Sequence, residues 1–265
     1  MLLAQISDMH VVSPGHRLLE RIDTPSYLAQ AVSHLNRLSP RPDFVIATGD
    51  LVDDGSIGAY QLLRRALDEL SMPYAVMPGN HDSRVNLRKV FGDQTPFPAD
   101  GDFLHYAIED FPLRIIALDT VVDGKEGGLL SAERVAWLAD RLSEQACRPT
   151  LIAMHHPPFI TGIDDMDAIN CGNSEQLGEI VRRHSQIERI VCGHMHRPII
   201  VRWNGTVVCT APSTAHQVAL NLTPGASAAW VAEPPACYLH YWTPQADLVT
   251  HLSYIGDFGG PRSFG

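Results

Sequence analysis

The stretch that decides the fold is Phe44-Val45-Ile46-Ala47-Thr48-Gly49-Asp50-Leu51-Val52-Asp53-Asp54-Gly55. Its first half is a continuous apolar run, which predicts a strand buried on both faces of a sheet over residues 43–49. Asp50 follows at the carboxyl end of that strand, where the loops of an open α/β sheet form the ligand crevice. A single Gly-Asp pair after a strand is more often a turn than a site. The functional interpretation therefore depends on how the other strands end.

Elements of alternating type surround this strand and predict an α/β fold with a parallel sheet. Short apolar runs that are typical of strands occupy residues 2–7, 74–77, 103–108, 113–118, 150–154 and 189–192. Apolar positions recur at helical spacing over residues 28–38, 60–70, 135–142 and 174–184. We expect Thr24 and Ser56 to cap the first two of these helices, and the third to begin at Ser131.

The alternation stops after residue 196, and two hairpins are predicted instead. One covers residues 199–209 and turns at Asn204-Gly205, a favoured two-residue turn, and the other pairs 237–242 with 248–254. Residues 221–236 show no periodicity. We expect a single domain, with a catalytic core over 1–212 and a C-terminal extension over 213–265. The extension is rich in aromatic residues, which is typical of interfaces, so we expect it to serve oligomerisation and pocket closure; ordinary core packing is the alternative.

Composition excludes several classes of protein. The chain has 265 residues, of which 45% are apolar and 19% charged, as in globular domains. A net charge of −10 argues against binding nucleic acid polymers or acidic membrane surfaces. The five cysteines are scattered and suggest neither a disulfide framework nor a zinc ribbon. The N-terminus lacks the features of a signal peptide, and no apolar run approaches the roughly 18 residues of a membrane span, so we expect a cytoplasmic protein.

Five strands end in side chains that are typical metal ligands. The segments, in chain order, are Asp8-Met9-His10, Gly49-Asp50, Gly79-Asn80-His81-Asp82, His155-His156 and Gly193-His194-Met195-His196. Side chains two apart on a strand point the same way, which predicts that Asp8 converges with His10, and His194 with His196. Each motif alone is as well explained by a turn or a core histidine. Together they favour a site for more than one ion of Zn, Mn, Fe or Co, because the ligands are nitrogen and oxygen without thiolate.

This series of motifs resembles, in order and spacing, the signature of calcineurin-like metallophosphoesterases. Within that family the chain is similar to class III cyclic nucleotide phosphodiesterases and bacterial glycerophosphodiesterases, from Met1 to about residue 220. The likeness includes Met154-His155-His156-Pro157-Pro158 and His216-Gln217-Val218. It implies a four-layer αββα sandwich of two mixed β-sheets flanked by helices. It also implies a homo-oligomer, either a dimer or a trimer of dimers.

The resemblance implies a role for each matching position. One divalent ion would be held by Asp8, His10, Asp50 and His196, and a second by Asp50, Asn80, His155 and His194. Asp50 would bridge the two ions, and His156 would lie outside the ligand set. His81 would lie over the substrate's phosphate and leaving oxygen as the proton donor, and Asn80 and His216 would contact substrate. Asp50, Asn80 and His81 would thus be the catalytic residues.

The implied reaction is hydrolysis of small phosphodiesters, glycerophosphodiesters and/or cyclic nucleotides, by in-line attack of a hydroxide that bridges two divalent ions. The same site also suits a phosphomonoesterase or a nucleotide pyrophosphohydrolase. From another class, a non-catalytic scaffold that binds a partner protein is the alternative. Protein phosphatases of this superfamily carry an Arg where this chain has Asp54, and a carboxylate there would repel a dianionic monoester; a cap of the next turn is the alternative role for Asp54. We therefore expect diesters to be preferred.

Overall fold

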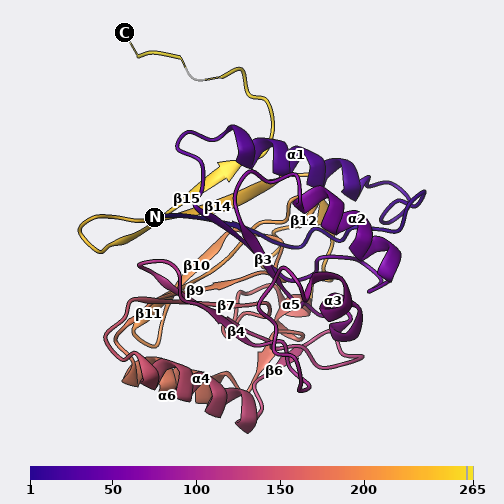
Figure 1. Cartoon of the computed structure of the whole chain (residues 1–265). Coiled ribbons are helices and arrows are strands. Elements are labelled where there is room, and N and C mark those ends of the chain that lie inside the picture. The colour runs from indigo at the N-terminus through magenta and orange to yellow at the C-terminus, as the bar shows by residue number, and fades with distance from the viewer. Residues whose placement is uncertain (261, 265) are drawn as a thin grey trace.

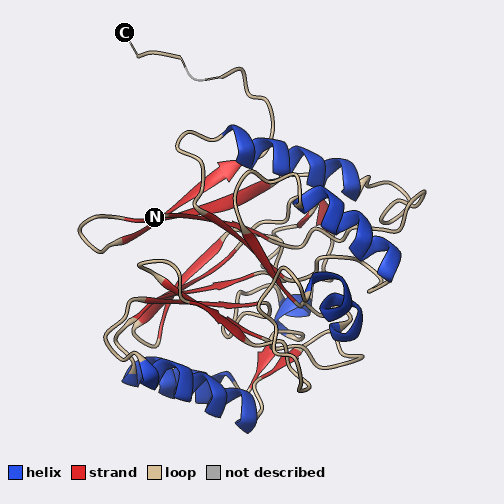
Figure 2. Ribbon diagram, viewed as in Figure 1, coloured by secondary structure: helices blue, strands red, loops and turns tan. Residues whose placement is uncertain are grey.

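Two β-sheets pack face to face between two layers of helices in the computed structural model, which describes residues 1–260 and 262–264 (Figures 1 and 2). Helices α1 (Thr24–Arg37) and α2 (Ile57–Leu67) cover the outer face of one sheet, and α4 (Ala132–Glu144) and α6 (Ser174–Arg183) cover the other. The αββα sandwich that the resemblance implied is confirmed.

The first sheet has the strand order β15-β14-β1-β2-β3. Its strands β1 (Leu2–Ile6), β2 (Phe44–Thr48) and β3 (Tyr74–Met77) are parallel. The predicted C-terminal hairpin, β14 (Ala236–Trp242) and β15 (Leu248–Tyr254), continues this sheet, because β14 pairs antiparallel with β1. The C-terminal segment therefore supplies two of the five strands.

The second sheet has the order β10-β11-β9-β7-β5-β4. Its parallel centre consists of β5 (Arg114–Leu118), β7 (Thr150–Met154), β9 (Ile187–Cys192) and β11 (Thr206–Thr210). The edges β4 (Tyr106–Ile108) and β10 (Ile199–Trp203) run antiparallel to their neighbours. The predicted hairpin at Asn204-Gly205 joins β10 and β11, and both turn residues have positive φ angles, 49° and 101°.

Strand β2 shows why the opening stretch determines the architecture. Val45 and Ala47 face the core beneath α1 and α2, whereas Phe44 and Ile46 face the core between the two sheets. All five residues of the strand are buried, as its unbroken apolar run predicted. A strand buried on both faces needs a covering layer on each side, and the helices and the second sheet provide them.

Several elements differ from the sequence prediction. Asp23 rather than Thr24 caps α1, since its side chain accepts a hydrogen bond from Ser26 N at 3.3 Å. Helices α3 (Arg84–Phe91) and α5 (Asp164–Asp167) were not predicted. Neither were the two-residue pairs β6 (Gly128–Leu129) with β8 (Cys171–Gly172), and β12 (Gln217–Val218) with β13 (Trp230–Val231). Elements of two to four residues are too short to carry a periodic pattern.

The two sheets bring the carboxyl ends of their parallel strands to one edge. The loops after β1, β2 and β3 meet those after β7 and β9 there, as hydrogen bonds from Asp8 N to Gly49 O and from His194 N to the Asp8 carboxylate show. All five predicted ligand motifs lie in these loops. In the described part of the chain, no helix combines the length and the apolar content that a membrane crossing demands.

Candidate metal centre

The backbone at the predicted ligands is unusual. Asp8, His10, Asp50, His194 and His196 all lie in the left-handed region, with φ between 42° and 69°. Such a conformation costs a non-glycine residue roughly 1–3 kcal/mol and is concentrated at functional sites. Asp8 and His10 converge as predicted, whereas His194 and His196 belong to separate clusters. The reason given for the convergence was also wrong, because β1 and β9 both end before the motifs begin.

Two glycines allow the loops to approach one another. A Cβ at Gly49 would lie 2.4 Å from His155 Nδ1, and one at Gly79 would lie 2.3 Å from Asp50 Oδ1. Neither distance is possible between non-bonded heavy atoms, so any side chain at these positions would push the two sheets' loops apart. The glycines that precede Asp50 and Asn80 in the sequence motifs are thus required by packing against the neighbouring ligands.

The first predicted ligand set, Asp8, His10, Asp50 and His196, forms a buried cluster whose ligand atoms lie within 4.8 Å of one another. His10 Nε2 is 3.1 Å from His196 Nε2 and 3.5 Å from Asp50 Oδ2. His196 Nε2 is also 3.4 Å from Asp8 Oδ1. Ligands about 2.1 Å from a shared ion are separated by about 3.0–3.4 Å in octahedral or tetrahedral geometry, so this spacing fits a metal site.

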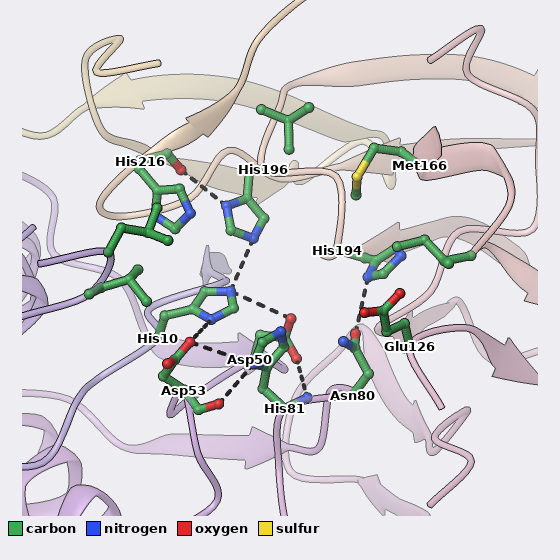
Figure 3. A pocket seen from close by; sticks show the side chains of 14 residues that line it. His10, Asp50, Asp53, Asn80, His81, Glu126, Met166, His194, His196 and His216 are labelled. Carbon is green, nitrogen blue, oxygen red and sulfur yellow. Dashed lines mark hydrogen bonds and ion pairs between the residues drawn. The ribbon is translucent and has the colours of Figure 1, made fainter. Parts of the chain in front are cut away.

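The second predicted set lies against the first, since the two share Asp50; Asp50, Asn80 and His194 of this set are drawn in Figure 3. Asn80 Oδ1 is 3.2 Å from His155 Nε2 and 3.1 Å from His194 Nδ1, and His155 Nε2 is 3.4 Å from Asp50 Oδ2. One carboxylate oxygen, Asp50 Oδ2, therefore faces a histidine of each set. The other oxygen of Asp50 accepts a hydrogen bond from the His81 backbone N–H at 3.0 Å, which fixes the orientation of the carboxylate.

The histidine tautomers show that the centre is arranged for a cation. His155 Nδ1 donates to Thr48 O at 2.8 Å, and His196 Nδ1 donates to His216 O at 3.1 Å. Because a carbonyl can only accept, the Nε2 atom of each neutral ring carries a lone pair that faces the centre. Lone pairs pointing at oxygens or at another ring nitrogen repel unless a cation lies between them. Outer N–H groups held in this way are also typical of metal-binding histidines.

Buried charge at the centre leads to the same conclusion. Burial raises the pKa of the Asp8 carboxyl to about 6 and lowers the pKa of His194 to about 3. Burial also opposes protonation of His155, but the Asp50 carboxylate outweighs it and raises the pKa of His155 to about 9. A protonated His155 is thus the counter-ion of Asp50 when no other cation is bound. A divalent ion supplies that charge instead and releases the proton.

Comparison with known proteins agrees with this geometry. The family described as Calcineurin-like phosphoesterase matches residues 1–198. The chain belongs to this family. A probable glycerophosphodiester phosphodiesterase GpdQ of Arcobacter nitrofigilis is 41% identical over 265 residues, which is 100% of this chain and 97% of that protein. The 3',5'-cyclic adenosine monophosphate phosphodiesterase CpdA of Escherichia coli K12 is 31% identical over 219 residues, covering 81% of this chain and 76% of that protein.

Solved structures show the same fold at much lower sequence identity. A dimetal phosphatase from Danio rerio aligns with a TM-score of 0.61 and 16% identity, and the alignment covers 97% of this chain and 99% of that one. The purple acid phosphatase PPD1 from yellow lupin aligns with a TM-score of 0.60 and 14% identity over 91% of this chain and 49% of that one. The calcineurin-like phosphoesterase fold thus accommodates very different sequences.

The pocket of this calcineurin-like phosphoesterase opens over the two clusters and has a volume of about 300 Å³. His81 and His216 line it, as the resemblance implied. His81 is 39% exposed, and its Nδ1 donates to Asp53 O at 2.8 Å. The His216 ring lies 4.6 Å from that of His196, centroid to centroid. His156 lies with His155 and His194 in a group whose ligand atoms come within 4.8 Å of one another, but both of its ring nitrogens have other partners, Thr120 Oγ1 at 2.8 Å and Glu126 O at 3.0 Å.

The expectation for Asp54 was wrong, and the carboxylate at the pocket is that of its neighbour. Asp54 is exposed, accepts a hydrogen bond from Ser56 N at 3.0 Å and does not line the pocket. Asp53 does line it, and its Oδ1 lies 3.3 Å from His10 Nδ1. Both residues belong to one turn, where no periodicity indicates which side chain faces inward.

Other pocket residues also escaped the sequence analysis. Glu126 comes from the loop after β5, Met166 and Ile169 from the segment around α5, and Leu18 and Leu19 from the loop before α1. Glu126 and Met166 lie across the pocket from His10 and Asp53 (Figure 3). None of these residues belongs to a recognisable motif, and only the tertiary fold brings them together.

Proposed function

We propose that this chain is a metal-dependent phosphodiesterase that hydrolyses small phosphodiesters, glycerophosphodiesters and/or cyclic nucleotides. Relatives named for these two activities support the proposal, one of them along the full chain. The observation that carries it is the position of Asp50 Oδ2, within 3.5 Å of His10 Nε2 and 3.4 Å of His155 Nε2. A single carboxylate oxygen between two histidine-rich clusters is what a two-ion centre requires of its bridge.

The two clusters would hold two divalent ions per subunit, drawn from Mn, Fe, Zn and Co. The first would use Asp8, His10, Asp50 and His196, and the second Asp50, Asn80, His155 and His194. Ions in such a pair supply Lewis acidity for phosphoryl transfer, namely an activated water and neutralisation of the phosphate charge. The glycines and the hydrogen-bonded imidazoles of this chain hold the ligands in place.

His81 would assist departure of the alcohol. Its Nδ1 is committed to donating to Asp53 O, so Nε2 is the atom that holds or gives a proton at the pocket. An alkoxide is a poor leaving group, and a positioned proton donor contributes typically 10²–10⁴-fold to such a step. Asn80 and His216, which line the same pocket, would contact the substrate.

A preference for diesters over monoesters also belongs to this proposal. The described residues that line the pocket include no Lys or Arg, but they include the carboxylates of Asp53 and Glu126. These carboxylates repel the two negative charges of a monoester more than the single charge of a diester. Each 1.36 kcal/mol of this difference corresponds to about tenfold in rate.

We further propose a cytoplasmic homo-oligomer, a dimer or a trimer of dimers, that does not bind nucleic acid polymers or membranes. The charge of −10 supports the exclusions. Within the C-terminal extension, 213–265, Tyr238 and Trp242 are buried in the core, whereas Tyr241, Tyr254 and Phe258 are 40%, 52% and 69% exposed. The exposed aromatic residues are the ones available to an interface, and His216 and Val218 are those at the pocket.

The test is turnover of bis(p-nitrophenyl) phosphate beside p-nitrophenyl phosphate, by enzyme stripped with a chelator and then reloaded with Mn²⁺, Zn²⁺ or Co²⁺. We expect metal-dependent hydrolysis with the diester preferred. His155→Ala should abolish it, whereas His251→Ala should not, because His251 is exposed on β15, far from the centre in the fold. Hydrolysis that survives the chelator, or a preference for the monoester, would contradict the proposal.

A further inference from the structure

An exposed leucine sits on a strained turn at the mouth of the pocket. Leu18 and Ile22 exchange two backbone hydrogen bonds of 2.9 Å, which closes a tight turn before α1. Leu19 and Glu20 occupy its tip with φ angles of 50° and 59°. Turns with two consecutive positive φ angles are normally made by Asn-Gly or similar pairs. This chain places a leucine there, and its side chain is 52% exposed.

Buried residues at the base of this turn hold it in place. Leu18 and Ile22 are buried and pack with Val12 and Ala215 in a small apolar cluster, and Leu18 also lines the pocket. Their anchoring overcomes the unfavourable conformation of the tip. This strained turn lies at the pocket and presents an apolar side chain to solvent. Both features suggest a role in binding. Leu19 lines the pocket, whereas Glu20 does not.

The pocket has two further apolar lining residues. Met166 and Ile169 line it from the segment around α5, and that segment is acidic, yet none of its carboxylates lines the pocket. Asp164 instead accepts a hydrogen bond from Gly225 N at 2.7 Å, and Asp165 one from Ala228 N at 2.8 Å. These hydrogen bonds hold the segment against the loop after β12. Only apolar side chains of the segment line the pocket.

Resting on the proposed function, we infer that Leu19 and Met166 form an apolar subsite for one alcohol group of the diester. The metal-ligand side of the pocket is polar and takes the phosphate, so the second ester group is left to the apolar lining residues Leu19 and Met166. The absence of Lys and Arg among the described lining residues means that this group is not an anion. The preferred substrates are diesters with an apolar-faced alcohol, such as an aryl, alkyl or base-bearing ribosyl group.

The experiment compares the methyl, n-butyl and phenyl esters of p-nitrophenyl phosphate, which share one leaving group and differ only in the other alcohol. In the wild-type holoenzyme, kcat/KM should rise from methyl to phenyl. In Leu19→Gly the phenyl-to-methyl ratio should fall by about fivefold, the factor expected from losing part of one leucine's burial. Met166→Ala should lower the ratio in the same direction.

Glu20→Gly is the matched control, because it relieves the same backbone strain without changing the lining. Both glycine variants should have a Tm at or above that of the wild type, and only Leu19→Gly should lose selectivity. An unchanged ratio in Leu19→Gly and Met166→Ala, with the methyl ester still hydrolysed, overturns this inference alone. A Tm that falls in Leu19→Gly but not in Glu20→Gly assigns Leu19 to packing and also overturns it. A wild type that hydrolyses none of the three esters overturns the proposed function as well.

Discussion

Asp53 and Asp54 are adjacent in sequence, but Asp53 lines the pocket and Asp54 does not. Replacing each in turn tests the description of the metal centre. Asp53 Oδ1 accepts a hydrogen bond from His10 Nδ1, which leaves Nε2 of that ring facing the first cluster. The hydrogen bond lowers the pKa of Asp53, so the carboxylate is ionised when it performs this role. Asp54 caps a turn on the surface and contacts no ligand. We expect Asp53→Ala to weaken metal binding and Asp54→Ala to leave it unchanged.

The structure sets the size of the effect. Removing a partner that orients a metal ligand typically costs 10–100-fold in affinity or activity. At 3.3 Å this hydrogen bond is longer than the usual N–H···O range, and the Asp53 side chain is 33% exposed, so water can replace it in part. The lower end, about tenfold or 1.4 kcal/mol, is therefore expected for Asp53→Ala. Asp53→Asn keeps an acceptor oxygen and should lose only about threefold.

The assay is calorimetric titration of the metal-free proteins with Mn²⁺, together with the dependence of diester turnover on Mn²⁺ concentration. Wild type and Asp54→Ala should bind Mn²⁺ with the same, highest affinity. Asp53→Asn should bind Mn²⁺ more weakly, and Asp53→Ala most weakly. At saturating Mn²⁺ most of the activity should return if Asp53 acts through His10. Equal affinities in all four proteins, or a loss in Asp54→Ala as large as that in Asp53→Ala, would refute this reasoning.

Three further predictions concern stability and metal loss. Asp82→Ala should lower the free energy of unfolding by about 2–4 kcal/mol in chemical denaturation, because the buried N–H groups of Gly79 and Leu51, now 2.8 and 3.1 Å from Asp82 Oδ2, lose their acceptor. Burial lowers the pKa of His240 to about 3, whereas the unfolded chain protonates this ring near 6.5, so the unfolded state takes up the proton first. Stability should thus fall as the pH drops from 6.5 towards 4, by up to about 1.4 kcal/mol per pH unit, and less steeply in His240→Gln. Gentle chelation should remove the ion of the Asn80 cluster first, because that cluster has no carboxylate of its own, and simultaneous loss of both ions in elemental analysis would contradict this.

Strands and helices with a regular pattern of apolar residues could be predicted from the sequence, because burial dictates that pattern. The apolar run of β2 and the cap Ser56 are found where we expected them, and α4 begins directly after Ser131. Helix α3 was missed, although Ser83 caps it and Leu87 and Phe91 recur one turn apart, so a signal was present.

The shape of the site could not be predicted in the same way. The left-handed conformation of Asp8 and His10 results from hydrogen bonds between loops, Asp8 N to Gly49 O and His10 N to Asp50 O, rather than from local propensity. Whether Asp53 or Asp54 faces the pocket depends on which side of their shared turn the rest of the fold covers. The candidate metal ligands could be predicted because metal chemistry restricts them to a few residue types. The apolar residues of the pocket could not, because the same residue types also form the hydrophobic core.

The most direct test of the account is the metal content and diester turnover of Asp50→Ala beside the wild type. Wild-type protein reconstituted with Mn²⁺ should hold two ions per chain and hydrolyse bis(p-nitrophenyl) phosphate. Loss of a bridging ligand removes several kcal/mol of charge stabilisation, so the variant should retain at most one ion and lose about 10³-fold in kcat. An Asp50→Ala protein that keeps both ions and turns over the diester within tenfold of the wild type would contradict the account.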